Sequence, residues 1–282
     1  MSITPVHDRL LRGDDQVPLG IAQLHLATAD QLTRLHYLSG SLKYVKKQLK
    51  AMTGNGLIVS DALPTKQRSS PYYYALGARG AEYLNRAGME VKAYRGSKAE
   101  DDSPFIRHTL EVNDLLISAM LLGKANPAYW LDDYRHEHDL KRKPYMLGRR
   151  PLIPDGFLNF QTRTPGGVMQ MPIALEHDRG TEFQQDFRLK IRRYVTFLHK
   201  RGQAELFGVG AITIAFTTFR DEARLEQMRR WTKAELASTS EPETIWHAFY
   251  FATLDKPPEP GCWLERRWYT AFDDTPVVLL AM

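Results

Sequence analysis

Cysteine is almost absent from this sequence of 282 residues, in which Cys262 is the only one. A single cysteine excludes an internal disulfide and a cysteine-based zinc site, and it fits a reducing compartment. No catalytic motif surrounds Cys262, so we expect a thiol that is packed in the interior.

Long apolar runs are also missing. The strongest ones, around 115–122 and 207–216, are too short and too interrupted to span a bilayer. The first residues include Asp8, Asp14 and Asp15 and contain no apolar segment of the kind that a signal peptide needs. Together with the scarcity of cysteine, these absences predict a cytoplasmic protein that makes no contact with a membrane.

Acidic residues are scarce in only one part of the chain. Residues 1–96 carry 13 Lys/Arg and 7 Asp/Glu, whereas residues 104–282 carry 24 and 23. The net charge of +5 therefore arises mainly in the N-terminal third. This asymmetry predicts that one end of the molecule contacts a polyanion.

The N-terminal third has the pattern of three helices, two strands and a closing helix. Thr28 can cap the second helix, Ser39 or Ser41 can cap the third, and Gly54-Asn55-Gly56 ends it. The predicted helices are 17–26, 28–37, a third that ends at about 54, and 77–88, and the predicted strands are 57–61 and 72–76. This order is typical of a winged helix-turn-helix domain, to which we assign residues 1–96.

The third helix is one-sided in charge. Its apolar side consists of Leu42, Val45, Leu49 and Met52, and its opposite side of Lys43, Lys46, Lys47 and Lys50. A solvated helix face usually mixes signs, because like charges three and four residues apart repel. Four lysines without an acid are better explained by DNA phosphates. Tyr44, Gln48 and Asn55 remain to contact bases, and Lys66 and Arg68, in the loop between the strands, extend the predicted DNA-binding set.

A polar run at 97–103 reads as a linker to a second domain, 104–282. The predicted elements there are a helix at 105–122, strands at 134–141, 153–161 and 171–178, a helix after 181, a strand at 207–217, a helix at 221–236 and a strand at 245–253. The order α-β-β-β-α-β predicts a mixed sheet with flanking helices, and hence an α+β fold for the whole chain.

Three carboxylates lie at the ends of two neighbouring strands in this second domain. Asp155 heads one strand, and Glu176 and Asp178 end the next, where strand alternation directs both to the same face. Such a cluster repels itself unless a divalent cation, such as Mg²⁺, or a cationic side chain neutralises it. The spacing is equally compatible with three unrelated surface carboxylates at turns.

The helix that follows the carboxylates carries a lysine on its apolar side. Thr181 is a candidate N-cap, and the predicted buried stripe consists of Phe183, Phe187, Ile191, Tyr194, Phe197 and Leu198. Lys190 falls within that stripe, where an unpaired ammonium group is costly to bury. Its stem can reach the helix edge, or the ammonium group can reach the carboxylates.

The αβββαβ order, with Pro154-Asp155 on the second strand and Glu176-x-Asp178 on the third, resembles the PD-(D/E)xK nuclease superfamily. The resemblance implies a restriction-endonuclease-like fold in which Asp155 and Glu176 bind Mg²⁺, supported by Asp178, while a lysine assists the attacking water. Asp178 stands where the motif has its lysine. Some members supply that lysine from the following helix, where Lys190 is the matching residue.

The chain over roughly 20–220 is also similar to the replication-relaxation family of plasmids and other mobile elements. The likeness consists of the winged-helix front, His108-x-Leu110-x-x-Asn113-Asp114, Trp130, Glu137, Pro154-Asp155, the stretch 175–182 and Lys190-x-x-x-Tyr194. It implies DNA binding in replication control or DNA mobilisation more firmly than it implies cleavage.

We therefore expect a DNA-binding protein of a mobile element, acting in plasmid-type replication control or mobilisation. Its expected partners are double-stranded DNA and a relaxase or replication protein, and a homodimer is compatible with this role. In this reading the nuclease-like domain is a scaffold in which Asp178 and Lys190 form an ion pair. The alternatives are a Mg²⁺-dependent DNA endonuclease, with Asp155, Glu176, Asp178 and Lys190 as catalytic residues, and a transcriptional repressor.

Overall fold

The computed structural model describes residues 16–63, 71–94, 103–239 and 241–280. The chain divides into two compact units, the N-terminal unit, which extends to Ile117, and the C-terminal unit, which begins at Ser118. Helices and a mixed sheet occur together, so the predicted α+β class is confirmed. No helix in these described ranges is long and apolar enough to cross a membrane.

The N-terminal unit contains the predicted helices and strands. They are α1 (Gln16–Leu24), α2 (Ala29–His36), α3 (Leu42–Gly54), β2 (Ile58–Ala62), β3 (Tyr72–Leu76) and α4 (Ala78–Arg86). A short strand that the sequence did not predict, β1 (Leu26–Thr28), completes an antiparallel sheet in the order β1-β3-β2.

Local sequence explains where these elements begin. Thr28 caps α2 through a capping box, in which its hydroxyl accepts from the Gln31 N–H and the Gln31 side chain accepts from the Thr28 N–H. The start of α4 lies close to the backbone before β2: a Cβ at Gly80 would lie 2.1 Å from the Leu57 carbonyl oxygen. Only glycine permits that approach.

The helix α5 (Ser103–Ala125) contributes its first turns to the N-terminal unit. Ile106 and Leu110 are buried in one cluster with residues of β1 and β3. Asn113 donates hydrogen bonds to the carbonyl groups of Leu24 (3.0 Å) and Leu26 (2.6 Å). The predicted linker at 97–103 lies outside the described residues except for Ser103, so the predicted domain boundaries stay a prediction.

The C-terminal unit is built on a large mixed sheet with strand order β12-β11-β10-β9-β8-β7-β4. Its strands are β4 (Tyr129–His136), β7 (Gly156–Thr164), β8 (Gly167–Asp178), β9 (Thr213–Thr218), β10 (Phe249–Thr253), β11 (Arg266–Thr270) and β12 (Val277–Val278). The pairs β4·β7 and β7·β8 are antiparallel, whereas β8·β9 and β9·β10 are parallel. The sheet is therefore mixed, as predicted.

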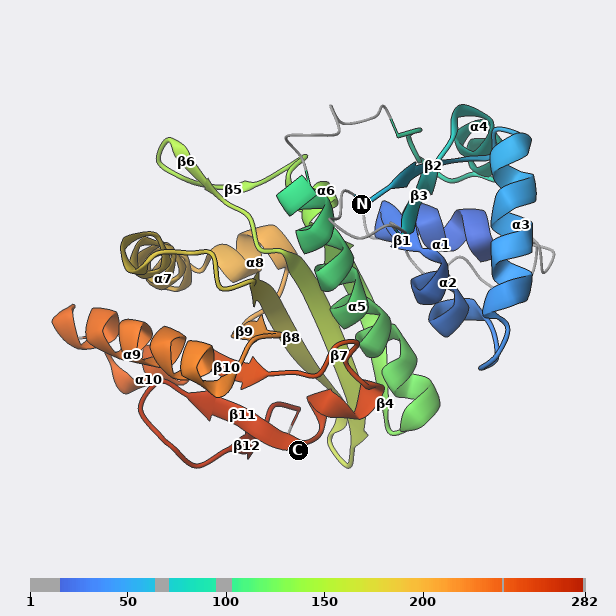
Figure 1. The fold of residues 1–282 in the computed structure, drawn as a ribbon. Helices are drawn as coiled ribbons and strands as arrows, with labels where there is room; N and C mark the ends of the chain where they lie inside the picture. Colours follow the sequence, from blue (N-terminus) through green and yellow to red (C-terminus); the bar gives the residue numbers. More distant parts are fainter. Residues whose placement is uncertain (1–15, 64–70, 95–102, 240, 281–282) are drawn as a thin grey trace. The chain divides into compact units, whose positions relative to one another are not determined.

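Further elements connect these strands. They are α6 (Glu137–Leu140), the hairpin of β5 (Tyr145–Leu147) and β6 (Arg150–Leu152), α7 (Gln184–His199), α8 (Gly202–Phe207), α9 (Glu222–Ser238), α10 (Glu243–Trp246) and a 3-10 turn at Pro260–Trp263. In Figure 1, α9 lies beside β10, and α7 packs against α9.

All five strands predicted for this unit have different bounds in the structure. Those placed at 153–161 and 171–178 lie at Gly156–Thr164 and Gly167–Asp178. The one placed at 134–141 ends at His136, because the imidazole Nδ1 accepts a hydrogen bond from the His138 N–H and caps α6. The strands placed at 207–217 and 245–253 begin later, after α8 and α10. These short helices carry too few residues for a clear periodicity, so the apolar runs that contain them read as strand.

The core between the sheet and the helices α7 and α9 is rich in aromatic rings. Phe187 of α7 lies against Phe216 of β9, with ring centroids 5.1 Å apart, and Phe216 stacks on Phe251 of β10 at 5.4 Å. On the opposite face, the Trp263 indole N–H donates to the Ser118 hydroxyl at 3.0 Å. Cys262 is buried beside it, and burial raises the pKa of its thiol to about 12. The predicted packed thiol is thus confirmed.

Candidate functional site

Glu176 and Asp178 lie at the end of β8 and face the helices α7 and α9. His177, between them, faces the other way, and its Nδ1 lies 3.1 Å from the Thr217 hydroxyl. This arrangement follows from the alternation of side chains along a strand, which directs residues 176 and 178 to one face and residue 177 to the other. All three side chains are buried.

Glu176 is held by two side chains from successive turns of α7. The Tyr194 hydroxyl donates to Oε1 at 2.5 Å, and Lys190 Nζ lies 2.9 Å from Oε2. Lys190 Nζ also lies 2.5 Å from Glu182 Oε1 in the loop before the helix. The lysine on the apolar stripe therefore reaches the carboxylates, and its charge is neutralised by two of them. We call Glu176, Lys190, Tyr194 and Glu182 the β8–α7 network.

Burial dominates the electrostatics of this network. It raises the pKa of Glu176 to about 7, and nearby Asp155 adds to the rise, although Lys190 and Tyr194 oppose it. For Lys190, burial lowers the pKa, but Glu176, Glu182 and Asp155 together raise it above its ordinary value. Burial and then Glu176 raise the pKa of Tyr194 well above 10.0. Lys190 thus stays charged and Tyr194 stays a neutral donor at pH 7.

Asp178 is bound by an arginine that the sequence did not point to. Arg224, in the first turn of α9, donates from Nε to Oδ1 (2.7 Å) and from Nη2 to Oδ2 (2.8 Å). The Gly180 N–H adds a third hydrogen bond to Oδ1 at 2.6 Å. Such a two-pronged guanidinium contact is among the strongest ways to neutralise a carboxylate. The expected ion pair between Asp178 and Lys190 is therefore wrong: each has a different partner.

Asp155 directly precedes β7 and faces the turn at the end of β8. Its Oδ2 accepts a hydrogen bond from the His177 N–H at 2.7 Å, and its carbonyl group accepts one from the Glu137 N–H at 3.1 Å. Asp155 also acts electrostatically on Glu176 and Lys190. It is thus a neighbour of the β8–α7 network, fixed by backbone contacts.

The fit of Mg²⁺ to these carboxylates can be tested from their partners. Both oxygens of Glu176 and both oxygens of Asp178 are engaged by protein donors, and a hydrogen bond occupies one oxygen of Asp155. In the described ranges there is no group of three His, Cys, Asp or Glu side chains that could hold a metal ion. This arrangement does not present a shared ligand set, and the magnesium site stays a prediction.

The start of α7 differs from the prediction. Its N-cap is Phe183 rather than Thr181, and the Phe183 side chain is 78% exposed instead of belonging to the buried stripe. Gly180 has a φ of +78°, and the following residues continue as a loop up to Phe183. Because of this loop, α7 begins later in the sequence than predicted, and Glu182 lies within hydrogen-bond distance of Lys190.

The lysines of α3 form the second candidate site. Val45 and Leu49 are buried, whereas the side that we call the α3 lysine face is exposed at Lys43, Lys46, Lys47 and Lys50. Gln48 accepts from the Tyr37 hydroxyl (2.8 Å) and donates to the Tyr44 hydroxyl (2.7 Å), so two of the three candidate base-reading side chains, Tyr44 and Gln48, already have protein partners. Lys66 and Arg68 lie outside the described residues.

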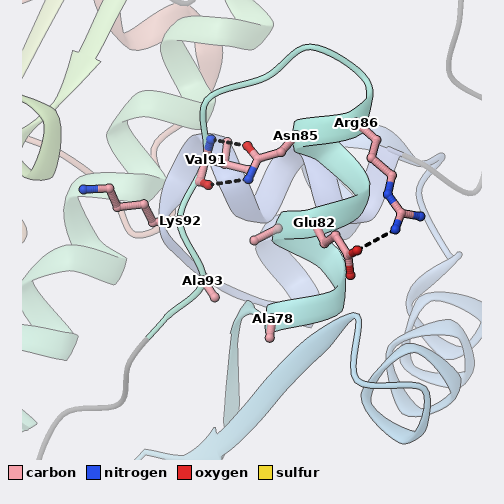
Figure 2. Close-up of a pocket in the computed structure, with 8 residues that line it drawn as sticks. Ala78, Glu82, Asn85, Arg86, Val91, Lys92 and Ala93 are labelled. Carbon is pink, nitrogen blue, oxygen red and sulfur yellow. Dashed lines mark hydrogen bonds and ion pairs between the residues drawn. The ribbon is translucent and has the colours of Figure 1, made fainter.

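A hollow of about 670 Å³ lies beside α4 in the same unit. Figure 2 shows Asn85 joined to the backbone of Val91 by two hydrogen bonds, Glu82 paired with Arg86, and Lys92 extending away from α4. The rest of its lining is small and apolar, including Ala78, Ala81 and Ala93. It contains none of the predicted site residues.

Comparison with protein families identifies the chain. The model of the replication-relaxation family matches residues 20–209, which is more than half of the sequence. The chain belongs to the replication-relaxation family. This membership associates it with plasmid replication or mobilisation. A search of curated proteins gave no significant match.

The matched region includes α3, the β8–α7 network and the motif residues Asn113 and Asp114. In the structure, the side chains of these two residues bind other parts of the N-terminal unit. Asp114 Oδ1 accepts from Gln31 Nε2 at 3.0 Å and pairs with Arg34 at 2.7 Å, beside the Asn113 contacts to Leu24 and Leu26. This part of the family motif thus ties α5 to α1, β1 and α2.

Proposed function

We propose that this protein binds duplex DNA through the N-terminal unit, as a winged helix, in replication control or mobilisation of a plasmid-type element. The α3 lysine face carries this proposal. Four ammonium groups within eight residues repel one another, and none has an acid of its own helix to neutralise it. Phosphates relieve that repulsion and release counterions from the DNA. A relaxase or replication protein is the protein partner that fits this role.

For the C-terminal unit we propose a PD-(D/E)xK-like scaffold. The order α5, β4, β7, β8, α7, β9 matches the αβββαβ core of that superfamily once α6, the β5–β6 hairpin and α8 are treated as insertions. Two of the three carboxylates at the superfamily's metal site, Glu176 and Asp178, are engaged here by Lys190, Tyr194 and Arg224. This supports a unit that is stabilised by its ion pairs and does not cut DNA.

A charge-reversal experiment tests the docking element. Lys46→Glu with Lys47→Glu should weaken binding of the full-length protein to any duplex and reduce the salt dependence of log Kd by about 2, because two phosphate contacts are lost. The control is Lys92→Glu with Lys124→Glu, which changes the net charge equally at exposed positions elsewhere. Equal losses in both variants, or none in the α3 variant, would show that α3 is not the docking element.

One observation favours the endonuclease as second candidate. Lys190 comes from the helix after the Glu176 strand and lies 2.9 Å from that carboxylate, with Asp155 nearby. If the protein is a nuclease, it should nick supercoiled plasmid with Mg²⁺ or Mn²⁺, and Lys190→Ala should abolish nicking while DNA affinity is retained. We expect no nicking by the wild-type protein, and cutting by the wild type but not by the variant would overturn the scaffold proposal.

A further inference from the structure

A strongly basic hairpin in the C-terminal unit has no role in the function described so far. Between Leu140 and Asp155 the sequence contains five basic residues and no acid, and β5 and β6 form the hairpin. The exposed cations are Lys141, Arg142, Lys143, Arg149 and Arg150. Lys141 and Arg142 have ion-pair partners in α6, Glu137 and Asp139. The cations nearer the tip make no ion pair with any described residue.

The hairpin is anchored through its apolar side. Tyr145 is buried and meets Phe197 of α7 edge to face, with ring centroids 5.0 Å apart. Leu152 is buried in the same core. A Cβ at Gly202 would lie 2.3 Å from the Phe197 ring and 2.8 Å from the Tyr145 ring, so only glycine fits beneath this contact. Figure 1 shows the hairpin reaching out beside α7, to which β5 is packed. It is therefore an attached arm with its basic side outward.

A hollow of about 290 Å³ lies between this arm and α7. Its lining includes the four cations Arg150, Arg192, Arg193 and Lys200, and no acidic side chain from the described residues. Arg192 is neutralised by Glu235 of α9, which also pairs with Arg188 at 2.7 Å. Arg150, Arg193 and Lys200 have no such partner in the described part of the chain. These three cations line one hollow, and no acidic side chain among the described residues neutralises them.

We propose that the β5–β6 hairpin and the adjoining side of α7 form a second DNA-phosphate surface. Arg193 lies in α7 and Lys200 is its C-cap residue, seven residues later and about 10 Å along the helix axis, and the hairpin adds Arg149 and Arg150. A line of cations of this length fits successive phosphates of a strand better than a single small anion. The one aromatic ring of the arm, Tyr145, is buried, so the surface contacts the backbone and reads no bases.

This inference rests on the proposed DNA binding and adds a contact that the N-terminal unit does not supply. The test uses the full-length protein and a random-sequence duplex, with affinity measured over a range of salt concentrations. Arg150→Ala, Arg193→Ala and Lys200→Ala together should weaken binding about tenfold to a hundredfold at 0.1 M salt and reduce the salt slope by about 2 to 3. The matched control removes three exposed cations from the same unit: Lys124→Ala, Arg230→Ala and Arg266→Ala.

Combination with the α3 variant separates this inference from the proposed function. If the hairpin variant loses affinity but Lys46→Glu with Lys47→Glu does not, the second surface stands and α3 docking fails. If only the α3 variant loses affinity, or if the hairpin variant matches its control, the second surface is refuted. Losses in both variants that add on a logarithmic scale support both contacts.

A second pair of variants provides a test in case the triple variant does not fold. Arg149→Glu with Arg150→Glu changes only exposed side chains at the hairpin tip and should also weaken binding, whereas Arg149→Lys with Arg150→Lys keeps the charge and should retain most of it. If reversal at the tip leaves the affinity unchanged in a protein with wild-type melting temperature, the proposal is overturned.

Discussion

The α3 lysine face and the β8–α7 network differ in whether their cationic side chains have acidic partners within the protein. On α3, four lysines point outward and none of the residues on their own helix is acidic. In the network, Lys190 is mostly enclosed and contacts two carboxylates, and next to the network Arg224 binds a third carboxylate, Asp178. This difference indicates which cations are available to bind a ligand. A cation that the fold has already neutralised contributes to stability, whereas cations that the fold leaves exposed together are available to an anion from outside.

The largest expected effect is the loss of stability when the enclosed lysine of the β8–α7 network is replaced. Lys190→Ala leaves Glu176 buried with only Tyr194 as donor, so we expect the free energy of unfolding to fall by about 3 kcal/mol at pH 7.5. Urea denaturation followed by circular dichroism measures this loss. Lys190→Met is the matched variant, because it keeps the stem and removes only the charge. If Lys190→Met is as stable as wild type, packing of the stem, rather than the ion pair, accounts for the effect of Lys190.

The raised pKa of Glu176 predicts a pH dependence of somewhat smaller size. Between its ordinary value of 4.5 and about 7, the folded protein binds a proton that the unfolded chain has released, so stability from this group falls as pH rises through that window. The stability of wild type minus that of Glu176→Gln should therefore drop by roughly 2–3 kcal/mol from pH 5 to pH 8. Other groups titrate in both proteins and cancel. A difference that stays constant with pH would show that Glu176 titrates normally.

The contacts that could be predicted from sequence are those set by local periodicity. Strand alternation placed Glu176 and Asp178 on one face, and helical spacing placed Lys190 on the side of α7 that meets it. The partner of Asp178 could not be foreseen, because Arg224 lies 46 residues away on a helix whose position depends on the whole sheet. Sequence reading consequently paired Asp178 with the wrong cation.

The fold shows the same limit. Long elements such as α5 and β8 were predicted close to their observed positions, because many residues share one pattern. Elements of three or four residues, such as β1 and α6, are set by capping and by strand partners distant in sequence. The loop that begins at Gly180 moved Phe183 from the expected core to the surface, since a single positive φ redirects the chain.

The family motif residue Asn113 offers a third test, within the N-terminal unit. Its buried amide donates to two carbonyl groups, those of Leu24 and Leu26, which Asn113→Ala would leave without this donor. We expect a loss of about 2 kcal/mol in unfolding free energy. Asn113→Asp is a sharper variant, because it keeps the shape but replaces the donor by an acceptor, and it should cost at least as much. Unchanged stability in both variants would mean that α5 does not depend on this contact.

The smallest expected effect concerns the exposed side of the comparison, and its sign is informative. Lys46 and Lys47 each lie three or four residues from Lys43 and Lys50, so the double reversal to Glu turns four repulsive pairs on α3 into attractive ones. At about 0.2–0.5 kcal/mol for each of the four pairs, unfolding free energy should not fall and should rise by about 1–2 kcal/mol at low salt, with the gain fading as salt is added. Denaturation at two salt concentrations, beside the DNA titration of the same variant, measures both quantities. A variant that is more stable yet binds DNA more weakly would show that the four lysines increase DNA affinity and lower the stability of the helix. If stability falls instead, the lysines contribute to the fold, and the contrast with the β8–α7 network would have to be abandoned.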